Sequence, residues 1–134
     1  MRTQFEFGEG TTPLQLEAPS RPESVTAARH AVVEYAEQQG AETERVALGV
    51  SEAVTNAVVH GYRGGRRGPV RVAAQLNGDA LLVSVADEGE GIAPTAVGDD
   101  SGLGLMLIAT VADWMSVESS PERGTRIVMR FRYC

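Results

Sequence analysis

The sequence predicts an α+β two-layer sandwich, with a mixed, mostly antiparallel sheet and three helices on one face. Two alternating apolar runs flank Asn77-Gly78-Asp79, and Asn-Gly in this setting is a strong hairpin signal. Three other segments are interpreted as helices, and in two of them apolar residues recur at helical spacing up to a final glycine, Gly40 or Gly61. At 134 residues, the chain is expected to form a single domain over residues 1–134.

The predicted elements follow one another without an internal repeat. Alternating residues around a stretch with Gly and Pro predict an N-terminal hairpin, and Ser20 or Pro22 could open the first helix. The run Leu81–Ala86 is almost continuously apolar, so we expect it at the centre of the sheet. Strands are predicted at about Gln4–Phe7, Leu14–Glu17, Val70–Leu76, Leu81–Ala86, Met115–Ser119 and Thr125–Tyr133, and helices at about Glu23–Gln38, Thr43–His60 and Ser101–Trp114.

Composition narrows the class of protein. The net charge of -6 argues against general nucleic-acid binding. Every basic residue is Arg, so a phosphate contact from a side chain would come from a guanidinium or a His. The single cysteine, Cys134, cannot form an internal disulfide, which fits a reducing cytoplasm. No signal-peptide core or membrane span is visible, so we expect a cytoplasmic protein without a membrane partner.

The predicted helix Thr43–His60 has two neighbouring faces. Its apolar arc is the face expected to meet the core. Beside that arc runs a stripe in which Glu52 and Asn56 are four residues apart, so a carboxylate and a carboxamide point the same way. A solvated polar face is the alternative interpretation. The stripe consists of Arg45, Gly49, Glu52, Asn56 and His60.

The expected central strand runs directly into Asp87-Glu88-Gly89-Glu90-Gly91. A calcium loop would need oxygen ligands where Gly89 and Gly91 stand, so we exclude it. A plain turn is one remaining interpretation. In the other, Asp87 accepts a hydrogen bond from a ligand with an amino group, such as adenine, and the glycines let backbone approach a flat ligand.

Two further stretches of the chain are rich in glycine. Gly102-Leu103-Gly104-Leu105 opens the third predicted helix, where free backbone N–H groups could bind an anion. It is neither a dinucleotide fingerprint nor a Walker A loop, because it follows a loop and lacks the further residues of both motifs. The basic segment 62–69 could touch phosphates or a partner, or could be a flexible connector.

Four motifs in order resemble the Bergerat-fold (GHKL) ATPase superfamily: SEAVTNAVVHGY, DEGEGI, SGLGL and ERGTRIVMRF. The resemblance covers nearly the whole chain and implies that ATP and Mg²⁺ are cofactors. It implies that Asn56 holds Mg²⁺, that Asp87 accepts from the adenine amino group, and that Thr125 supports Asp87. The same resemblance places Gly89, Gly91 and Ile92 at the base, and Gly102, Leu103, Gly104 and Leu105 at the phosphates.

Glu52 favours one branch of the superfamily. Transfer of phosphate to a hydroxyl requires a base, whereas transfer to histidine does not. The chain therefore looks most like the anti-sigma-factor serine/threonine kinases, which implies a sigma factor and a small antagonist protein as partners, and a possible homodimer. Two alternatives remain: a non-catalytic nucleotide-dependent switch, and a detached histidine-kinase-type module. His60 could reach the phosphates or could be an ordinary helix-terminal residue.

The expected lid, residues 92–101, departs from the family pattern because it is short and acidic. From Glu88 to Glu122 the sequence has no Arg, Lys or His. A guanidinium for the γ-phosphate would have to come from Arg123, Arg126, the loop at residues 63–67 or a partner protein. This short, acidic lid puts full kinase activity in question.

Overall fold

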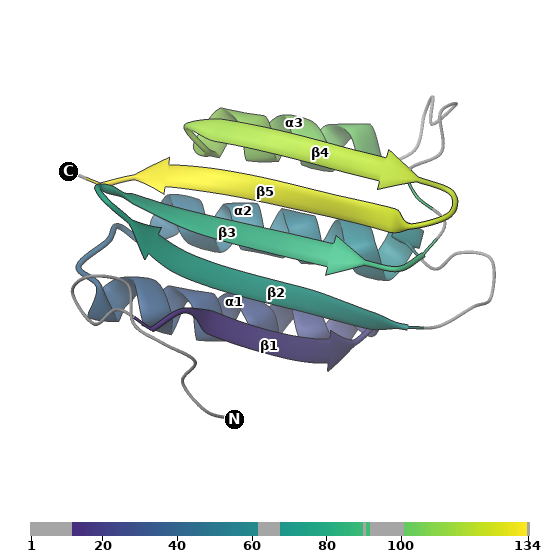
Figure 1. Cartoon of the computed structure of the whole chain (residues 1–134), viewed down its shortest axis with the longest axis horizontal. Coiled ribbons are helices and arrows are strands. Elements are labelled where there is room, and N and C mark those ends of the chain that lie inside the picture. Colours follow the sequence, from purple (N-terminus) through teal and green to yellow (C-terminus); the bar gives the residue numbers. More distant parts are fainter. Residues whose placement is uncertain (1–11, 62–67, 90, 92–100, 134) are drawn as a thin grey trace.

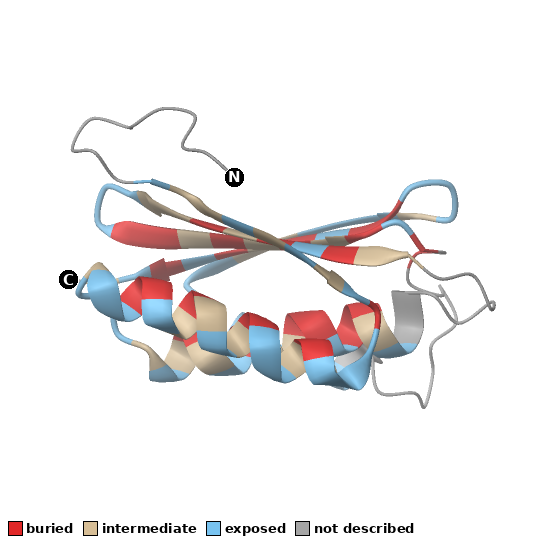
Figure 2. Ribbon diagram, turned by 90° about the horizontal axis from the view of Figure 1, so that it is seen from below, coloured by how far each residue is buried: buried red, intermediate tan, exposed pale blue. Residues whose placement is uncertain are grey.

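The computed structural model describes residues 12–61, 68–89, 91 and 101–133. One five-stranded sheet, in the order β1-β2-β3-β5-β4, forms the first layer. Three helices form the second layer, and all three cover the same face of the sheet (Figures 1 and 2). The predicted two-layer α+β fold is confirmed. Every neighbouring pair of described strands is antiparallel, so the mixed character that we expected is not seen in this part of the chain.

The bounds of the elements agree with the sequence prediction to within a few residues. The strands are β1 (Leu14–Pro19), β2 (Pro69–Asn77), β3 (Ala80–Asp87), β4 (Trp114–Ser120) and β5 (Gly124–Arg132). The helices are α1 (Pro22–Gln38), α2 (Glu44–Asn56) and α3 (Ser101–Val111). The predicted strand at Gln4–Phe7 lies outside the described residues, and β1 itself pairs with β2.

The β2–β3 hairpin confirms the strongest local signal in the sequence. Asn77 pairs with Ala80, so the two loop residues are Gly78 and Asp79. Gly78 has a φ of 67°, as the first loop residue of a type II′ turn requires. The central place predicted for Leu81–Ala86 is also confirmed, because β3 is the third of the five strands.

Two helices end earlier than predicted. The α-helical geometry of α2 stops at Asn56, and residues Ala57–Gly61 form a π-helical segment. The third helix ends at Val111 because the backbone N–H of Asp113 donates to the carbonyl of Arg130 at 2.8 Å, which starts pairing with β5. Trp114 is therefore the first residue of β4.

The core lies between the sheet and the helices. Alternate residues of β2, β3 and β5 are buried, as expected for strands with one covered face (Figure 2). From the helix side, α1 packs on β1 and β2, α2 packs on β3 and β5, and α3 packs on β4 (Figure 1). The fully buried side chains include Val32, Val46, Val50, Val54, Val72, Leu81, Val83, Ile108, Ile127 and Met129.

Among the described residues, no helix has both the length and the apolar content needed to cross a membrane.

Candidate functional site

Asp87 ends the central strand and is the most buried carboxylate of the candidate site. Only 6% of its surface is exposed, and its side chain points to the helix side of the sheet. The backbone N–H of Gly89 donates to its Oδ1 at 2.8 Å. Burial raises the pKa of Asp87, and hydrogen bonds from the backbones of Gly89 and Thr125 partly oppose that rise. The side chain thus keeps acceptor capacity in a partly dry setting.

Thr125 lies directly opposite Asp87 in the pairing of β3 with β5. Its backbone provides the hydrogen bond to Asp87. Its hydroxyl is 3.1 Å from the Oγ of Ser119 on β4. Support of Asp87 by Thr125, which the family resemblance implied, is therefore a backbone contact in this structure, while the side chain ties β5 to β4.

Gly124 is a residue that the sequence analysis missed. Its φ is 88°, which disfavours any other residue. A Cβ atom there would overlap the carbonyl oxygen of Asp87 and would lie 2.8 Å from the nitrogen of Gly89. The available signal was its place at the end of a Pro-Glu-Arg-Gly turn, opposite the strand that carries Asp87.

Gly91 makes a similar close approach to the sheet. Its φ is 79°, and a Cβ would lie 2.7 Å from the carbonyl oxygen of Ser120 and 2.9 Å from the Oγ of Ser119. Gly91 thus makes a close backbone contact with β4, whereas the approach to a flat ligand that we expected there stays a prediction. A position of Gly89 or Gly91 beside a base stays a prediction, and Ile92 lies outside the described residues.

The structure brings Glu52 of α2 next to the first turns of α3. A Cβ on Gly104 would lie 3.3 Å from Oε1 of Glu52. Two neighbours of Gly104 differ in exposure: Leu103 is 57% exposed, whereas Leu105 packs against the core. The predicted carboxylate and the predicted phosphate-binding stretch are therefore neighbours, although they are about fifty residues apart in the sequence.

Asn56, one turn after Glu52, is 7% exposed. Its Nδ2 atom is buried and has no hydrogen-bond partner among the described residues. A buried amide without a partner is costly, and rotation of the amide group exchanges the positions of its nitrogen and oxygen. Asn56 therefore fits a residue whose partner is a ligand or a metal-bound group.

The polar stripe predicted on α2 divides into two parts. Gly49 packs against β5, because a Cβ there would lie 2.8 Å from Cζ of Phe131. Arg45 reaches the far end of α3, so only Glu52 and Asn56 lie at the candidate site. The π-helical segment that follows Asn56 changes the spacing toward His60, whose side chain lies outside the described part.

Carboxylate, imidazole and thiolate ligands for a metal ion do not cluster in the described part of the chain. No three His, Cys, Asp or Glu side chains there form a cluster that could hold a metal ion. Mg²⁺ in nucleotide sites needs less, because it is commonly held by one or two protein oxygens together with phosphates and water. Asn56 fits this smaller role.

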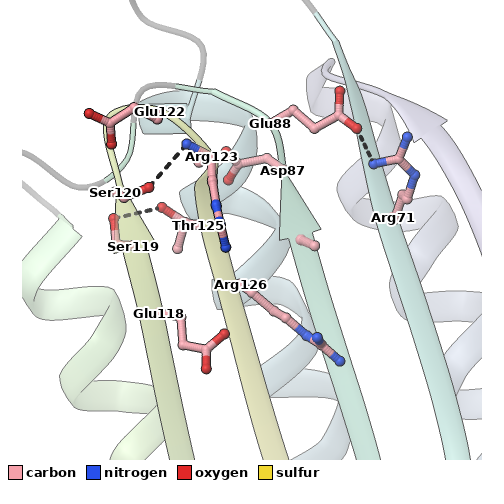
Figure 3. A pocket seen from close by; sticks show the side chains of 12 residues that line it. Arg71, Asp87, Glu88, Glu118, Ser119, Ser120, Glu122, Arg123, Thr125 and Arg126 are labelled. Atoms are coloured by element: carbon pink, nitrogen blue, oxygen red, sulfur yellow. Dashed lines mark hydrogen bonds and ion pairs between the residues drawn. The ribbon is translucent and has the colours of Figure 1, made fainter.

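A cavity of about 650 Å³ lies at the end of the sheet, reaching the face away from the helices (Figure 3). Arg123 and Arg126 line it together with Glu118, and Arg71 there forms an ion pair with Glu88 at 2.5 Å. Because Arg126 alternates with the inward residues of β5, it points away from α2. Arg126, one of the sources named for a guanidinium at the γ-phosphate, therefore lies on the other face of the sheet.

Comparisons with known proteins agree with this geometry. A model of the histidine kinase-like ATPase domain family matches residues 18–131. An "Anti-sigma F factor" of Clostridium beijerinckii is 31% identical over 134 residues, covering 90% of this chain and 94% of the relative. One from Thermoanaerobacter sp. is 31% identical over 135 residues with the same coverage. The crystal structure of the RsbU and RsbW domains of Rv1364c from Mycobacterium tuberculosis shares the fold, with TM-score 0.74 and 24% identity over 92% of this chain and 33% of that chain.

Gly124→Ala should destabilise the protein and disturb Asp87. We expect a loss of roughly 1–3 kcal/mol of unfolding free energy from the backbone conformation alone, and more from the overlap with the Asp87 carbonyl. Urea unfolding measures the loss. The matched control is Gly78→Ala, which also has a positive φ but has open space around the added Cβ. Equal losses in both variants would show that Gly124 is not needed for the contact with Asp87.

Asp87→Asn should become more stable relative to the parent as the pH rises, in the ligand-free protein. The pKa of Asp87 is raised in the folded state. The contribution of Asp87 to the free energy of unfolding is therefore fully present below the unfolded-state pKa, and it is lost as the pH rises through the folded-state pKa. Asn keeps an acceptor for Gly89 without ionising. The gain in unfolding free energy over the parent should therefore grow as the pH rises above about 4, the usual pKa of an Asp in an unfolded chain, and level off above the raised folded-state pKa.

Urea unfolding at a series of pH values tests this growth. Glu118→Gln, which removes an exposed carboxylate from β4, is the matched control. A gain for Asp87→Asn that stays constant with pH would contradict the assigned burial cost.

Proposed function

The chain belongs to the histidine kinase-like ATPase domain family, and we propose that it is an ATP-dependent regulatory kinase. In this proposal it transfers phosphate from Mg-ATP to a Ser or Thr of a small antagonist protein and also binds a sigma factor. Relatives that are 31% identical over nearly their whole length carry the name "Anti-sigma F factor", which supports the choice of partners. A cytoplasmic homodimer belongs to the same proposal.

The observation that carries the proposal is the placement of Glu52 beside Gly104. This contact puts a carboxylate next to the helix start that is proposed to receive the phosphates. Asn56 lies one turn further along α2 and has a buried amide atom without a described partner. In this proposal Glu52 is the base, the start of α3 binds the phosphates, and the amide of Asn56 meets the metal or the nucleotide, so the groups for phosphoryl transfer lie together beside α2.

Each residue has a distinct role in this mechanism. Asp87 accepts a hydrogen bond from the adenine amino group, and Thr125 and Gly124 keep its carboxylate in place. Glu52 takes the proton from the attacking hydroxyl. Asn56 contributes an oxygen to Mg²⁺, and the metal ion, when bound, neutralises charge on the phosphates. Backbone N–H groups of the first turn of α3 provide further donors to the phosphates.

A non-catalytic switch is the second candidate, because of the positions of the cations. The sequence from Glu88 to Glu122 has no basic residue, and Arg126 lies on the opposite face of the sheet. Kinases normally meet the γ-phosphate with a cation in addition to the metal. A switch would bind nucleotide and partner without transfer, and a detached histidine-kinase-type module would label a histidine.

Labelled ATP separates the three possibilities. The protein is incubated with Mg-ATP and candidate antagonist proteins, and the label is tested for acid stability. Acid-stable phosphoserine or phosphothreonine supports the proposal. Acid-labile phosphohistidine would favour the phosphorelay module, and nucleotide binding without label would favour the switch.

Glu52→Gln should separate binding from chemistry. We expect the affinity for Mg-ATP to stay within a few-fold and transfer to slow by about 10²–10⁴, the usual effect of losing a general base. Calorimetric titration and single-turnover transfer measure the two quantities. Glu44→Gln, an exposed carboxylate on the same helix, should alter neither by much. Transfer at the parental rate in Glu52→Gln would remove Glu52 from the role of base.

The isolated protein should distinguish ATP from ADP poorly, by less than about tenfold, which is about 1.4 kcal/mol. The start of α3 contributes only about 0.3–1 kcal/mol to anion binding in an exposed setting, and no cationic side chain lies between Glu88 and Glu122. Titrations of Mg-ATP and Mg-ADP into the partner-free protein measure the ratio. A hundredfold preference for ATP would mean that this chain already contains a γ-phosphate clamp.

A further inference from the structure

Arg45, in the first turn of α2, joins three elements at the end of the molecule opposite to Asp87. Its Nη1 donates to the carbonyl of Val111, the last residue of α3, at 3.1 Å. Its Nη2 donates to the carbonyl of Arg132, the last residue of β5, at 3.0 Å. A guanidinium at a helix C-terminus satisfies a free carbonyl and suits the negative end of the helix dipole.

Asp113 completes this contact from the connection between α3 and β4. Its Oδ2 accepts from the backbone N–H of Arg132 at 2.7 Å and from Nη1 of Arg45 at 3.4 Å. The end of α3 is thereby fixed to both α2 and β5. We call the pair Arg45 and Asp113 the clamp.

The rest of α3 is held by packing contacts. It packs chiefly against α2 and beyond that touches β4. Among residues 103–111, only Ile108 is fully buried, while Leu103 is 57% and Met106 is 66% exposed. Leu105 and Val111 also pack against the core, and the clamp fixes the C-terminal end of the helix by hydrogen bonds.

From these contacts we infer that Arg45 and Asp113 are positioning residues for phosphate binding, acting through α3. The inference rests on the proposed function.

An 11-residue helix is roughly 16 Å long, so a tilt of roughly 10° about its anchored end moves its first turn by roughly 3 Å. Gly104 already lies in near contact with Glu52, so such a movement changes the distance between the helix amides and the carboxylate. Asp87 is on β3 and is not moved by α3, so the clamp sets the phosphate contacts and leaves the adenine contact alone.

The test compares a nucleotide with its nucleoside. Arg45→Met keeps the aliphatic stem and removes every hydrogen bond of the guanidinium. We expect it to weaken Mg-ATP binding about 5- to 10-fold, since a displacement of about 1 Å already misplaces groups at such sites, and to leave adenosine binding within about twofold. Arg45→Lys, which keeps the charge, should restore part of the Mg-ATP affinity. The matched control is Arg29→Met, which removes a 3.2 Å bond to Ser51 between α1 and α2 and should preserve both affinities.

Hydrogen exchange gives a second readout without nucleotide. The backbone amides of residues 105–107, the first that are bonded within the helix, should exchange faster in Arg45→Met than in Arg29→Met. Equal exchange in the two variants, or equal weakening of Mg-ATP and adenosine in Arg45→Met, would overturn the role of the clamp. A parent protein that binds neither Mg-ATP nor adenosine is the separate result that removes the proposed function.

Discussion

The buried carboxylate of Asp87 is the constraint on which the functional end of the sheet depends. A carboxylate removed from water is unfavourable unless hydrogen bonds replace its hydration. The replacement comes from the backbones of Gly89 and Thr125, which belong to the turn after β3 and to the adjacent strand. Gly124 has to lack a side chain for this strand to come so close. The position of the Asp87 carboxylate therefore follows from the pairing register of β3 with β5.

The helix α2 combines structural and functional positions on one rigid element. Gly49 brings its backbone close to Phe131, and Arg45 fixes its first turn to α3 and β5. Glu52 and Asn56 follow on the same helix, so their positions are set by packing that involves neither of them. A site on such an element is held more accurately than one on a loop. The arrangement also explains how an arginine far from the candidate site bears on its geometry.

Local signals in the sequence were sufficient for the fold and for part of the site. The hairpin at Gly78, the central strand and the helices follow from patterns within a few residues, and Asp87 stands out because it ends an apolar strand. Arg45 and Val111 are 66 residues apart, and Gly124 meets Asp87 only after β3 and β5 have paired, so no local pattern reveals these contacts.

Two of the predictions that the structure corrects failed for different reasons. The end of α3 was placed too late because pairing with β5 overrides the helical tendency of the segment before Trp114. The outward direction of Arg126, by contrast, was available from strand alternation once Thr125 was expected to face the site.

The order of the strands also has a kinetic consequence. The hairpins β2–β3 and β4–β5 join neighbouring segments, whereas β3 and β5 pair only after the loop that contains α3 has closed. Contacts across long loops tend to form late in folding, so Asp87 and Thr125 should meet only when the native sheet is nearly complete. A bound nucleotide would then act as a brake on unfolding and would have little effect on the rate of folding.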